Sequence, residues 1–309
     1  MDYSSSLHLT SIKSLCANWI ADDIPSHFDI GGLVVGSRPA VAHLYMKQSG
    51  VLAGLPFFQE TFNSLSGCVV TWCNQQTPTP NPDTSKYVTQ PAVEGEKYTY
   101  DGRPILLAVV KGPVNQILRG ERTALCALSR CSGVATDSRL MVDFARSINW
   151  NGSVAGTRKT TPGFRVVEKY GLMVGGADTH WLDLSHMVML KDNHIWACNG
   201  DITECVRRAC SGCGFSSKIE VECRSVSEAL TACEAGADVV MLDNMKGEQA
   251  REAARVVKGK YKGVVVEVSG GITMETMGEY TGDDVDVVSC GKLTQEYQCL
   301  DFSLKIQQE

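Results

Sequence analysis

The second half of the chain repeats one pattern that restricts its fold more than any other feature. Short runs of apolar, β-branched residues alternate with longer stretches of helical composition. Such runs occupy residues 187–190, 219–221, 239–242, 264–268 and 285–288, and residues 154–157 form a sixth. Continuous apolar strands alternating with helices are typical of parallel sheets covered on both faces. Repeated strand–helix units at a spacing of roughly 20–30 residues predict a barrel or a doubly wound sheet.

Small or charged residues follow each of these runs. In both architectures the carboxyl ends of the strands carry the functional residues. Cations come first in the chain, with Arg158 and Lys159 after the first run and Lys191 after the second. A single polar residue after a strand is usually only a loop residue, but that interpretation does not explain five or six in succession. Cations meeting at one edge predict a substrate with carboxylates or phosphates.

The later strand ends carry acids and glycines. Glu222 and Asp243 end adjacent strands, and paired carboxylates beside a phosphorylated substrate usually hold Mg²⁺ or the hydroxyls of a ribose. Ser269-Gly270-Gly271 and Gly291 offer backbone N–H groups with no side chain in the way, as in a phosphate cradle. These residues predict an enzyme that binds a phosphorylated sugar, an acidic co-substrate and Mg²⁺.

The first 125 residues have a mixed pattern. Apolar spacing predicts a short amphipathic helix over residues 11–20 and a second helix over 123–135. Residues 41–47 and 68–73 are strand-like, and ordered structure resumes over 104–112. The stretch 75–97 is rich in Pro, Thr, Asn and Asp, which predicts an exposed loop.

Composition bears on partners and compartment. The net charge of −6 and a pI of about 5.6 provide no basic field, so we expect neither nucleic acid nor a membrane as partner. No run of about 18 apolar residues occurs, and the N-terminus does not resemble a signal peptide. Thirteen cysteines without a secretory signal indicate reduced thiols and a cytoplasmic protein. Cys210 and Cys213 have C-x-x-C spacing, but without a second pair ordinary thiols explain them better than zinc does.

Several motifs at the strand ends resemble those of one family. The ten residues 156–165, GTRKTTPGFR, are similar to the signature of quinolinate phosphoribosyltransferase, the carboxylating nicotinate-nucleotide pyrophosphorylase. KDNH at 191–194, EVEC at 220–223, LDN at 242–244 and SGGI at 269–272 are similar to family motifs as well. LDFSLK at 300–305 resembles the eukaryotic C-terminus, and the whole chain looks most like fungal members.

The resemblance implies an α/β fold and a reaction. An N-terminal α/β sandwich, residues 1–128, is expected to join an open, incomplete TIM-like barrel, residues 129–291, with residues 292–309 packing back on the sandwich. Phosphoribose passes from phosphoribosyl pyrophosphate to the ring nitrogen of quinolinate. Pyrophosphate and carbon dioxide leave, and nicotinate mononucleotide is formed for NAD biosynthesis. The implied cofactor is Mg²⁺, and the implied assembly is a homodimer or higher homo-oligomer with its sites at subunit interfaces.

The resemblance also implies roles for individual residues. The implied catalytic residues are Lys159, Lys191, Glu222 and Asp243, of which Glu222 and Asp243 hold the ribose and the metal. The implied substrate-binding residues are Arg122, Arg158, Lys159, His180, Trp181, Lys191, Ser269, Gly270, Gly271 and Gly291. Among them, Arg122 is supplied across the dimer, and the serine and glycines hold the 5′-phosphate. After transfer, the cationic ring nitrogen accepts the electrons of the departing carboxylate, so no further cofactor is needed.

The acceptor pocket departs from the family pattern. Trp181 follows His180 where the family has an arginine of the quinolinate-binding cluster, and Leu182 stands where tyrosine is common. Cys126 replaces a usual asparagine, and Val268 replaces a small residue. Losing one charged donor to a carboxylate costs about 1.5–3 kcal/mol, and leaving that carboxylate unpaired in a dry pocket costs more. Quinolinate binding would then weaken by about 10- to 100-fold or beyond.

Three functions therefore stay open at this point. The first is the transferase of NAD synthesis, in which a neighbouring cation, Arg165 or Lys292, compensates for Trp181. The second is a diverged paralogue that acts on another carboxylate or heteroaromatic acid. Such a paralogue includes a decarboxylase or bond-forming enzyme of specialised metabolism that does not use phosphoribosyl pyrophosphate. The third is a catalytically weak subunit that assembles with an active partner.

Overall fold

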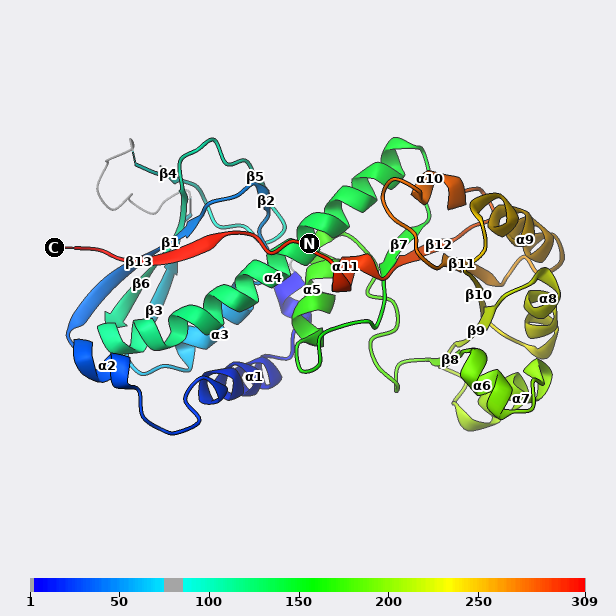
Figure 1. The fold of residues 1–309 in the computed structure, drawn as a ribbon, viewed down its shortest axis with the longest axis horizontal. Helices are drawn as coiled ribbons and strands as arrows, with labels where there is room; N and C mark the ends of the chain where they lie inside the picture. Colours follow the sequence, from blue (N-terminus) through cyan, green and yellow to red (C-terminus); the bar gives the residue numbers. More distant parts are fainter. Residues whose placement is uncertain (1–2, 75–85, 309) are drawn as a thin grey trace. The chain divides into compact units, whose positions relative to one another are not determined.

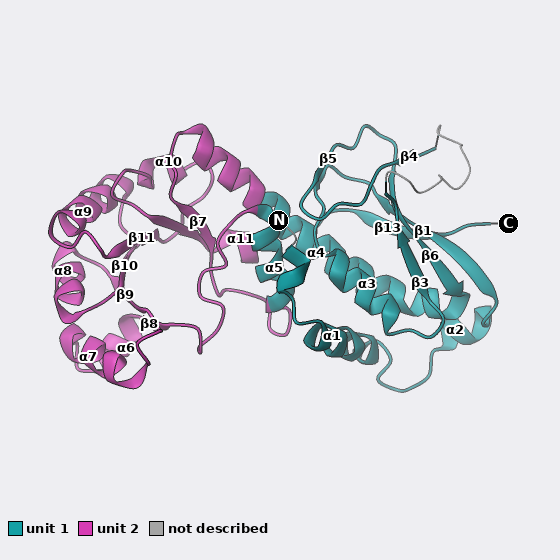
Figure 2. Cartoon of the chain, turned by 180° about the vertical axis from the view of Figure 1, so that it is seen from behind, with its two compact units in different colours: residues 1–137, 166–175, 297–309 teal, residues 138–165, 176–296 magenta. Residues whose placement is uncertain are grey.

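The chain forms two compact units, shown in separate colours in Figure 2. The structure, a computed structural model, describes residues 3–74 and 86–308. Unit 1 comprises residues 1–137, 166–175 and 297–309, and unit 2 comprises residues 138–165 and 176–296. The predicted domains, 1–128 with 292–309 and 129–291, place the boundaries elsewhere. One helix, α4 (Val114–Ser147), runs through the boundary, and α5 (Arg165–Gly175) belongs almost wholly to unit 1. Apolar periodicity predicts a helix, but it does not indicate to which compact unit each turn of that helix belongs.

Unit 1 is an α/β sandwich (Figure 1). Its main sheet has the order β13-β1-β6-β3, formed by β13 (Phe302–Ile306), β1 (Pro39–Met46), β6 (Ile105–Pro113) and β3 (Val69–Trp72), all antiparallel. Strand β4 (Val88–Thr89) pairs in parallel with β6, and β2 (Gly50–Val51) pairs with β5 (Lys97–Tyr98). The unit's helices besides α4 and α5 are α1 (Leu9–Asp22), α2 (Ile30–Val35) and α3 (Leu55–Asn63), preceded by a 3-10 turn at Tyr3–Ser6.

One apolar core holds the sheet and helices of unit 1 together. It joins Ile20 of α1, Phe58 and Phe62 of α3, and Leu128 of α4 to alternate residues of β1 and β6, all buried. Because side chains alternate across a strand, one face of the sheet supplies these contacts. The expected helix over 11–20 and strands over 41–47, 68–73 and 104–112 are found as α1, β1, β3 and β6. Of the expected loop 75–97, residues 75–85 lie outside the described residues, and the remainder carries β4 and the start of β5.

The expected helix over 123–135 is part of a much longer one. Helix α4 has 34 residues and begins directly after β6. Polar residues interrupt the apolar spacing along this helix, so the sequence predicted only part of its length. No helix in the described part of the chain combines the length and the apolarity needed to cross a membrane.

Unit 2 is an open parallel barrel. Six strands lie in the order β7-β12-β11-β10-β9-β8, and every neighbouring pair is parallel. They are β7 (Ser153–Gly156), β12 (Val287–Cys290), β11 (Val265–Ser269), β10 (Val239–Asp243), β9 (Ile219–Cys223) and β8 (Val188–Leu190). All six predicted runs are therefore strands. Within the described residues the edge strands β7 and β8 do not pair with each other, which leaves the barrel open.

Helices cover the outer face of this sheet (Figure 1). They are α6 (Asp192–Ala197), α7 (Ile202–Gly212), α8 (Val226–Ala235) and α9 (Gly247–Lys260), while the short α10 (Met277–Tyr280) packs on α9 and α11 (Lys292–Gln295) contacts β7. In β9, Ile219, Val221 and Cys223 are buried on the helical side, whereas Glu220 and Glu222 point to the opposite, inner face. The outer face of β9 is thus apolar, whereas the inner face of the sheet mixes acids such as Glu220 and Glu222 with apolar residues such as Met241.

Candidate active site

A cavity of about 360 Å³ opens at the carboxyl ends of the strands of unit 2. Its lining residues are Thr157, Arg158, Lys159, His180, Trp181, Met189, Lys191, Glu222, Met241, Asp243, Asn244, Ser269, Gly270, Gly271, Ser289 and Gly291. Every predicted site residue except Arg122 is among them. Arg122 lies in unit 1, exposed on α4. The cations, acids and glycines that follow the predicted strands therefore lie together at one cavity, as the sequence predicted.

Two acids stand side by side at the cavity mouth. Strand β9 pairs with β10 so that Glu222 lies opposite Met241, which puts Asp243, two residues further on, on the same inner face. Burial and then the negative charge of Glu222 raise the pKa of Asp243. Lys191 Nζ lies 2.9 Å from Glu222 Oε2 and offsets part of this negative charge. Two neighbouring carboxylates that repel each other fit a divalent cation, which would relieve that repulsion.

The glycines predicted to hold a phosphate form a tight backbone loop. Gly270 has φ 105° and Gly271 has φ 64°, both in the left-handed region that favours glycine. A Cβ at Gly270 would lie 2.5 Å from Asn244 Oδ1 and 2.7 Å from the Asn244 backbone nitrogen. A Cβ at Gly291 would lie 3.4 Å from Lys159 Nζ. Glycine is thus required at Gly270 by both conformation and space, and Lys159 lies directly beside Gly291.

The segment before β8 inserts two aromatic side chains into the barrel. Asp178 bridges to Ala155 of β7, and this contact carries the next residues into the open side of the sheet. His180 has φ 52°, a conformation that costs a non-glycine residue about 1–3 kcal/mol and is often found at functional sites. Trp181 is only 6% exposed and packs on Met189 and Met241. The pair therefore forms the inner wall of the cavity.

Beside His180 lies a buried acidic network that the sequence did not reveal. Glu267 Oε2 is 2.9 Å from His180 Nε2, and Glu267 Oε1 accepts a hydrogen bond of 2.6 Å from the Ser289 hydroxyl. Ser289 Oγ is also 3.0 Å from Ser269 Oγ. Burial, and then Glu267, raise the pKa of Glu220 well above its usual range. Strand alternation was the available signal, because a carboxylate inside an apolar run needs a polar interior to face.

Ligand-binding atoms of His180, Glu220 and Glu267 all lie within 4.8 Å of one another, a spacing that a metal ion also fits. Glu267, however, already has a protein partner on each of its oxygens. We therefore interpret Glu267 as the hydrogen-bonded support of His180, with Glu220 Oε2 3.9 Å from the same ring nitrogen.

Of the four departures from the pattern that the resemblance implies, only Trp181 lines the cavity, whereas Leu182, Cys126 and Val268 are not among its lining residues. Val268 is fully buried in β11, where alternation turns it away from the inward-facing Glu267 and Ser269. Cys126 is exposed on α4 in unit 1. The two cations proposed as compensation, Arg165 and Lys292, are not among the described residues that line the cavity. Trp181 is thus the one of these departures that lines the cavity, and neither Arg165 nor Lys292 places a cation beside it there.

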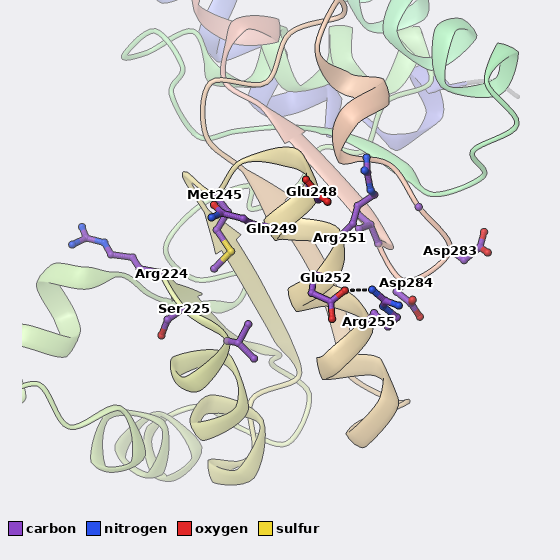
Figure 3. A pocket seen from close by; sticks show the side chains of 13 residues that line it. Arg224, Ser225, Met245, Glu248, Gln249, Arg251, Glu252, Arg255, Asp283 and Asp284 are labelled. Carbon is purple, nitrogen blue, oxygen red and sulfur yellow. Dashed lines mark hydrogen bonds and ion pairs between the residues drawn. The ribbon is translucent and has the colours of Figure 1, made fainter.

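A larger groove of about 850 Å³ lies between the start of α8, helix α9 and the loop before β12. Figure 3 shows its charged side chains, among them the ion pair of Glu252 with Arg255. Arg224 forms a pair of 2.5 Å with Asp192, and Arg251 donates to the Glu279 carbonyl oxygen. These arginines already have protein partners, and exposed pairs of this kind contribute little energy. Size alone therefore does not make this groove the active site.

Comparisons with known proteins give a consistent result. The family model for the quinolinate phosphoribosyl transferase C-terminal domain matches residues 134–305, and that for the N-terminal domain matches residues 29–132. The carboxylating nicotinate-nucleotide pyrophosphorylase of Rattus norvegicus is 46% identical over 97% of this chain and 92% of its own length. That of Dictyostelium discoideum is 45% identical over the full length of both chains. The solved structure of NadC from Streptococcus pyogenes has a TM-score of 0.80 at 32% identity, covering 97% of this chain and 98% of the other.

Proposed function

The chain belongs to the quinolinate phosphoribosyl transferase family, and on that premise we propose that it makes nicotinate mononucleotide for NAD biosynthesis. It transfers phosphoribose from phosphoribosyl pyrophosphate to the ring nitrogen of quinolinate, with loss of pyrophosphate and carbon dioxide. One observation carries the proposal. A single cavity gathers cations for an acidic acceptor, a pair of acids for a ribose and its metal, and a glycine loop for a phosphate.

The donor half of the cavity suits phosphoribosyl pyrophosphate. The backbone of Gly270, Gly271 and Gly291 offers N–H groups to the 5′-phosphate. Glu222 and Asp243 would hold Mg²⁺ and the ribose hydroxyls, and the bound metal would stabilise the charge of the leaving pyrophosphate. As that bond breaks, positive charge develops at ribose C1, and the neighbouring carboxylates stabilise it electrostatically.

The acceptor half suits a flat anion. Arg158, Lys159 and Lys191 supply positive charge for carboxylates, and His180 and Trp181 form the inner wall. Positioning the ring nitrogen against ribose C1 is the main task of these residues, because orientation alone lowers the barrier substantially. Once the bond forms, the ring nitrogen is cationic. It takes the electron pair released as the adjacent carboxylate leaves as carbon dioxide, and a proton replaces that group.

Trp181 supports a second candidate, an enzyme that uses a different carboxylated heteroaromatic acceptor. It occupies the place where the resemblance implies an arginine, and it is buried against the barrel interior. Incubating the purified protein with quinolinate, phosphoribosyl pyrophosphate and Mg²⁺ decides between the two. Formation of nicotinate mononucleotide with carbon dioxide supports the transferase. Absent turnover that Trp181→Arg restores would identify the missing cation as the cause and favour the second candidate.

Removing either acid should abolish Mg²⁺-dependent binding of phosphoribosyl pyrophosphate. Glu222→Ala and Asp243→Ala each delete one of the two carboxylates that face the mouth, so a metal would lose half of its protein ligands. Calorimetric titration with phosphoribosyl pyrophosphate, with and without Mg²⁺, measures this. Asp283→Ala, in the larger groove, is the matched control and should bind as the unchanged protein does. Equal affinity in all three variants would contradict the role of Glu222 and Asp243.

We also propose a homodimer or higher homo-oligomer in which Arg122 reaches the site of a neighbouring subunit. Arg122 is exposed on α4, so its guanidinium is available to another chain. We further propose a cytoplasmic location, because a chain with thirteen cysteines keeps them as thiols in a reducing compartment.

A further inference from the structure

Three buried nitrogen atoms in the wall of the cavity lack a hydrogen-bond partner. They are Arg158 Nε, His180 Nδ1 and Trp181 Nε1, and none of them has a hydrogen-bond partner among the described residues. Buried polar groups in folded proteins are nearly always paired, so a cluster of unpaired ones requires an explanation. All three belong to residues that line the same cavity. A bound anion with several oxygens would accept hydrogen bonds from Arg158 Nε and Trp181 Nε1, both of which carry an N–H group.

We infer that Trp181 is an acceptor-binding residue whose indole N–H donates to a carboxylate oxygen of the acceptor and whose ring face holds Arg158 in place. The inference rests on the proposed function, since the acceptor is taken to be a pyridine carboxylate. It assigns to Trp181 a role that a space-filling apolar residue could not perform.

The position of the Trp181 ring is defined by contacts on several sides. It is 6% exposed, and Met189 and Met241 pack against it in the barrel interior. Arg158 Cζ lies 4.4 Å from the ring centroid, well within the range of a cation–π contact. A ring held in this way has a fixed N–H direction, and the same contact fixes the guanidinium whose Nε is also unpaired. One residue thus orients two donors of the site.

This arrangement explains how the pocket works without the arginine that the resemblance implies at position 181. Tryptophan has one neutral N–H donor, whereas arginine has a charged guanidinium group with several N–H donors. The site therefore keeps a hydrogen bond to the carboxylate and loses one positive charge. Positive charge still comes from Lys159, Lys191 and Arg158, and the tryptophan ring positions Arg158.

Quinolinate titrated into the purified full-length protein tests the inference, with tryptophan fluorescence and calorimetry as readouts. Trp181→Phe keeps an aromatic ring and removes only the N–H. Losing a hydrogen bond to a charged group predicts a rise in the quinolinate Kd of about tenfold, up to about a hundredfold. The Kd of phosphoribosyl pyrophosphate should change by less than about twofold, because its cradle lies on other strands. In steady-state assays, the rise should appear in the KM for quinolinate rather than in kcat.

Trp196→Phe is the matched control. Trp196 also has an arginine over its ring, with Arg224 Cζ at 5.4 Å, but it is 59% exposed and does not line the cavity. Quinolinate should alter the fluorescence of this variant as in the unchanged protein, and should leave that of Trp181→Phe unaltered. An unchanged quinolinate Kd in Trp181→Phe would overturn the inference. If the phenylalanine variant does not fold, Trp181→Met provides the same test, because methionine adapts to gaps beside Met189 and Met241.

The outcomes for this inference and for the proposed function are separable. Trp181-dependent binding of quinolinate without formation of nicotinate mononucleotide would leave the inference standing and reject the proposed function. Normal turnover, together with equal quinolinate affinity in Trp181→Phe and Trp196→Phe, would support the proposed function and reject the inference about Trp181.

Discussion

At the scale of single residues, Glu267 connects the two halves of the site. Its carboxylate contacts His180 through one oxygen and Ser289 through the other, and Ser289 contacts Ser269 beside the glycine loop. A buried carboxylate needs partners, and here both oxygens have one. When His180 Nε2 donates to Glu267, the other ring nitrogen, Nδ1, is left as an acceptor without a partner among the described residues. Glu267 is thus a positioning residue that acts on the acceptor through His180.

Two substitutions of Glu267 separate geometry from charge. Glu267→Gln keeps an acceptor for His180 and a partner for Ser289, so the KM for quinolinate should stay within a few-fold. Glu267→Leu leaves both partners unpaired in a buried site and should lower the free energy of unfolding by about 3 kcal/mol. It should also raise the KM for quinolinate at least about tenfold, because His180 loses its orientation. Urea unfolding and steady-state kinetics measure these effects. Equal damage from both variants would show that the negative charge matters rather than the hydrogen bonds.

At the scale of elements, the strands of unit 2 were predictable and their faces were not. Each strand appeared in the sequence as an apolar, β-branched run, and the residues after each run marked the cavity correctly. Continuous apolar runs suggested two apolar faces, but the inner face carries Glu220 and Glu267. A single acid inside such a run does not by itself indicate a polar inner face. The register of the strands is needed to show that the acids of neighbouring strands face the same interior. The insertion of His180 and Trp181 depends on the bridge at Asp178, which no local pattern indicates.

Two helical glycines should respond oppositely to the same substitution. Gly133 lies inside α4, where a Cβ would collide with the Gln298 carbonyl oxygen and the Tyr297 ring. Gly133→Ala should therefore destabilise the protein by about 1–3 kcal/mol, although alanine is the better helix former. Gly259 lies in α9, where a Cβ would meet no atom within 4 Å, and Gly259→Ala should stabilise by about 0.5–1 kcal/mol. Chemical denaturation of both variants measures this. Stabilisation by Gly133→Ala would refute the close packing of α4 against the C-terminal segment.

At the scale of the whole molecule, unit 1 has a surface that suits assembly. Around α2, the apolar side chains of Phe28, Ile30, Leu33 and Val34 are 64–80% exposed. An exposed apolar cluster of this kind commonly marks a protein–protein interface. Asp29 anchors the segment, because its side chain accepts from the Gly32 backbone and pairs with Arg119 at 3.2 Å. A fixed apolar surface on unit 1 supports the proposed homo-oligomer.

Heterodimers decide whether Arg122 acts across the subunit interface. Arg122→Ala removes the arginine from unit 1, and Lys191→Ala removes a cavity cation from unit 2. A heterodimer of one chain of each kind contains one complete site if Arg122 reaches the neighbouring subunit, and none if it serves its own. Tagged heterodimers should therefore recover about half of the wild-type activity, whereas both homodimers stay nearly inactive. A heterodimer of the wild-type chain with a chain carrying both substitutions is the reference. If Arg122 acts across the interface, neither of its sites is complete, because each lacks one of the two residues. If Arg122 serves its own subunit, the reference heterodimer keeps about half of the activity and the heterodimer of the two single variants has none. The heterodimer that is active therefore shows which subunit Arg122 serves.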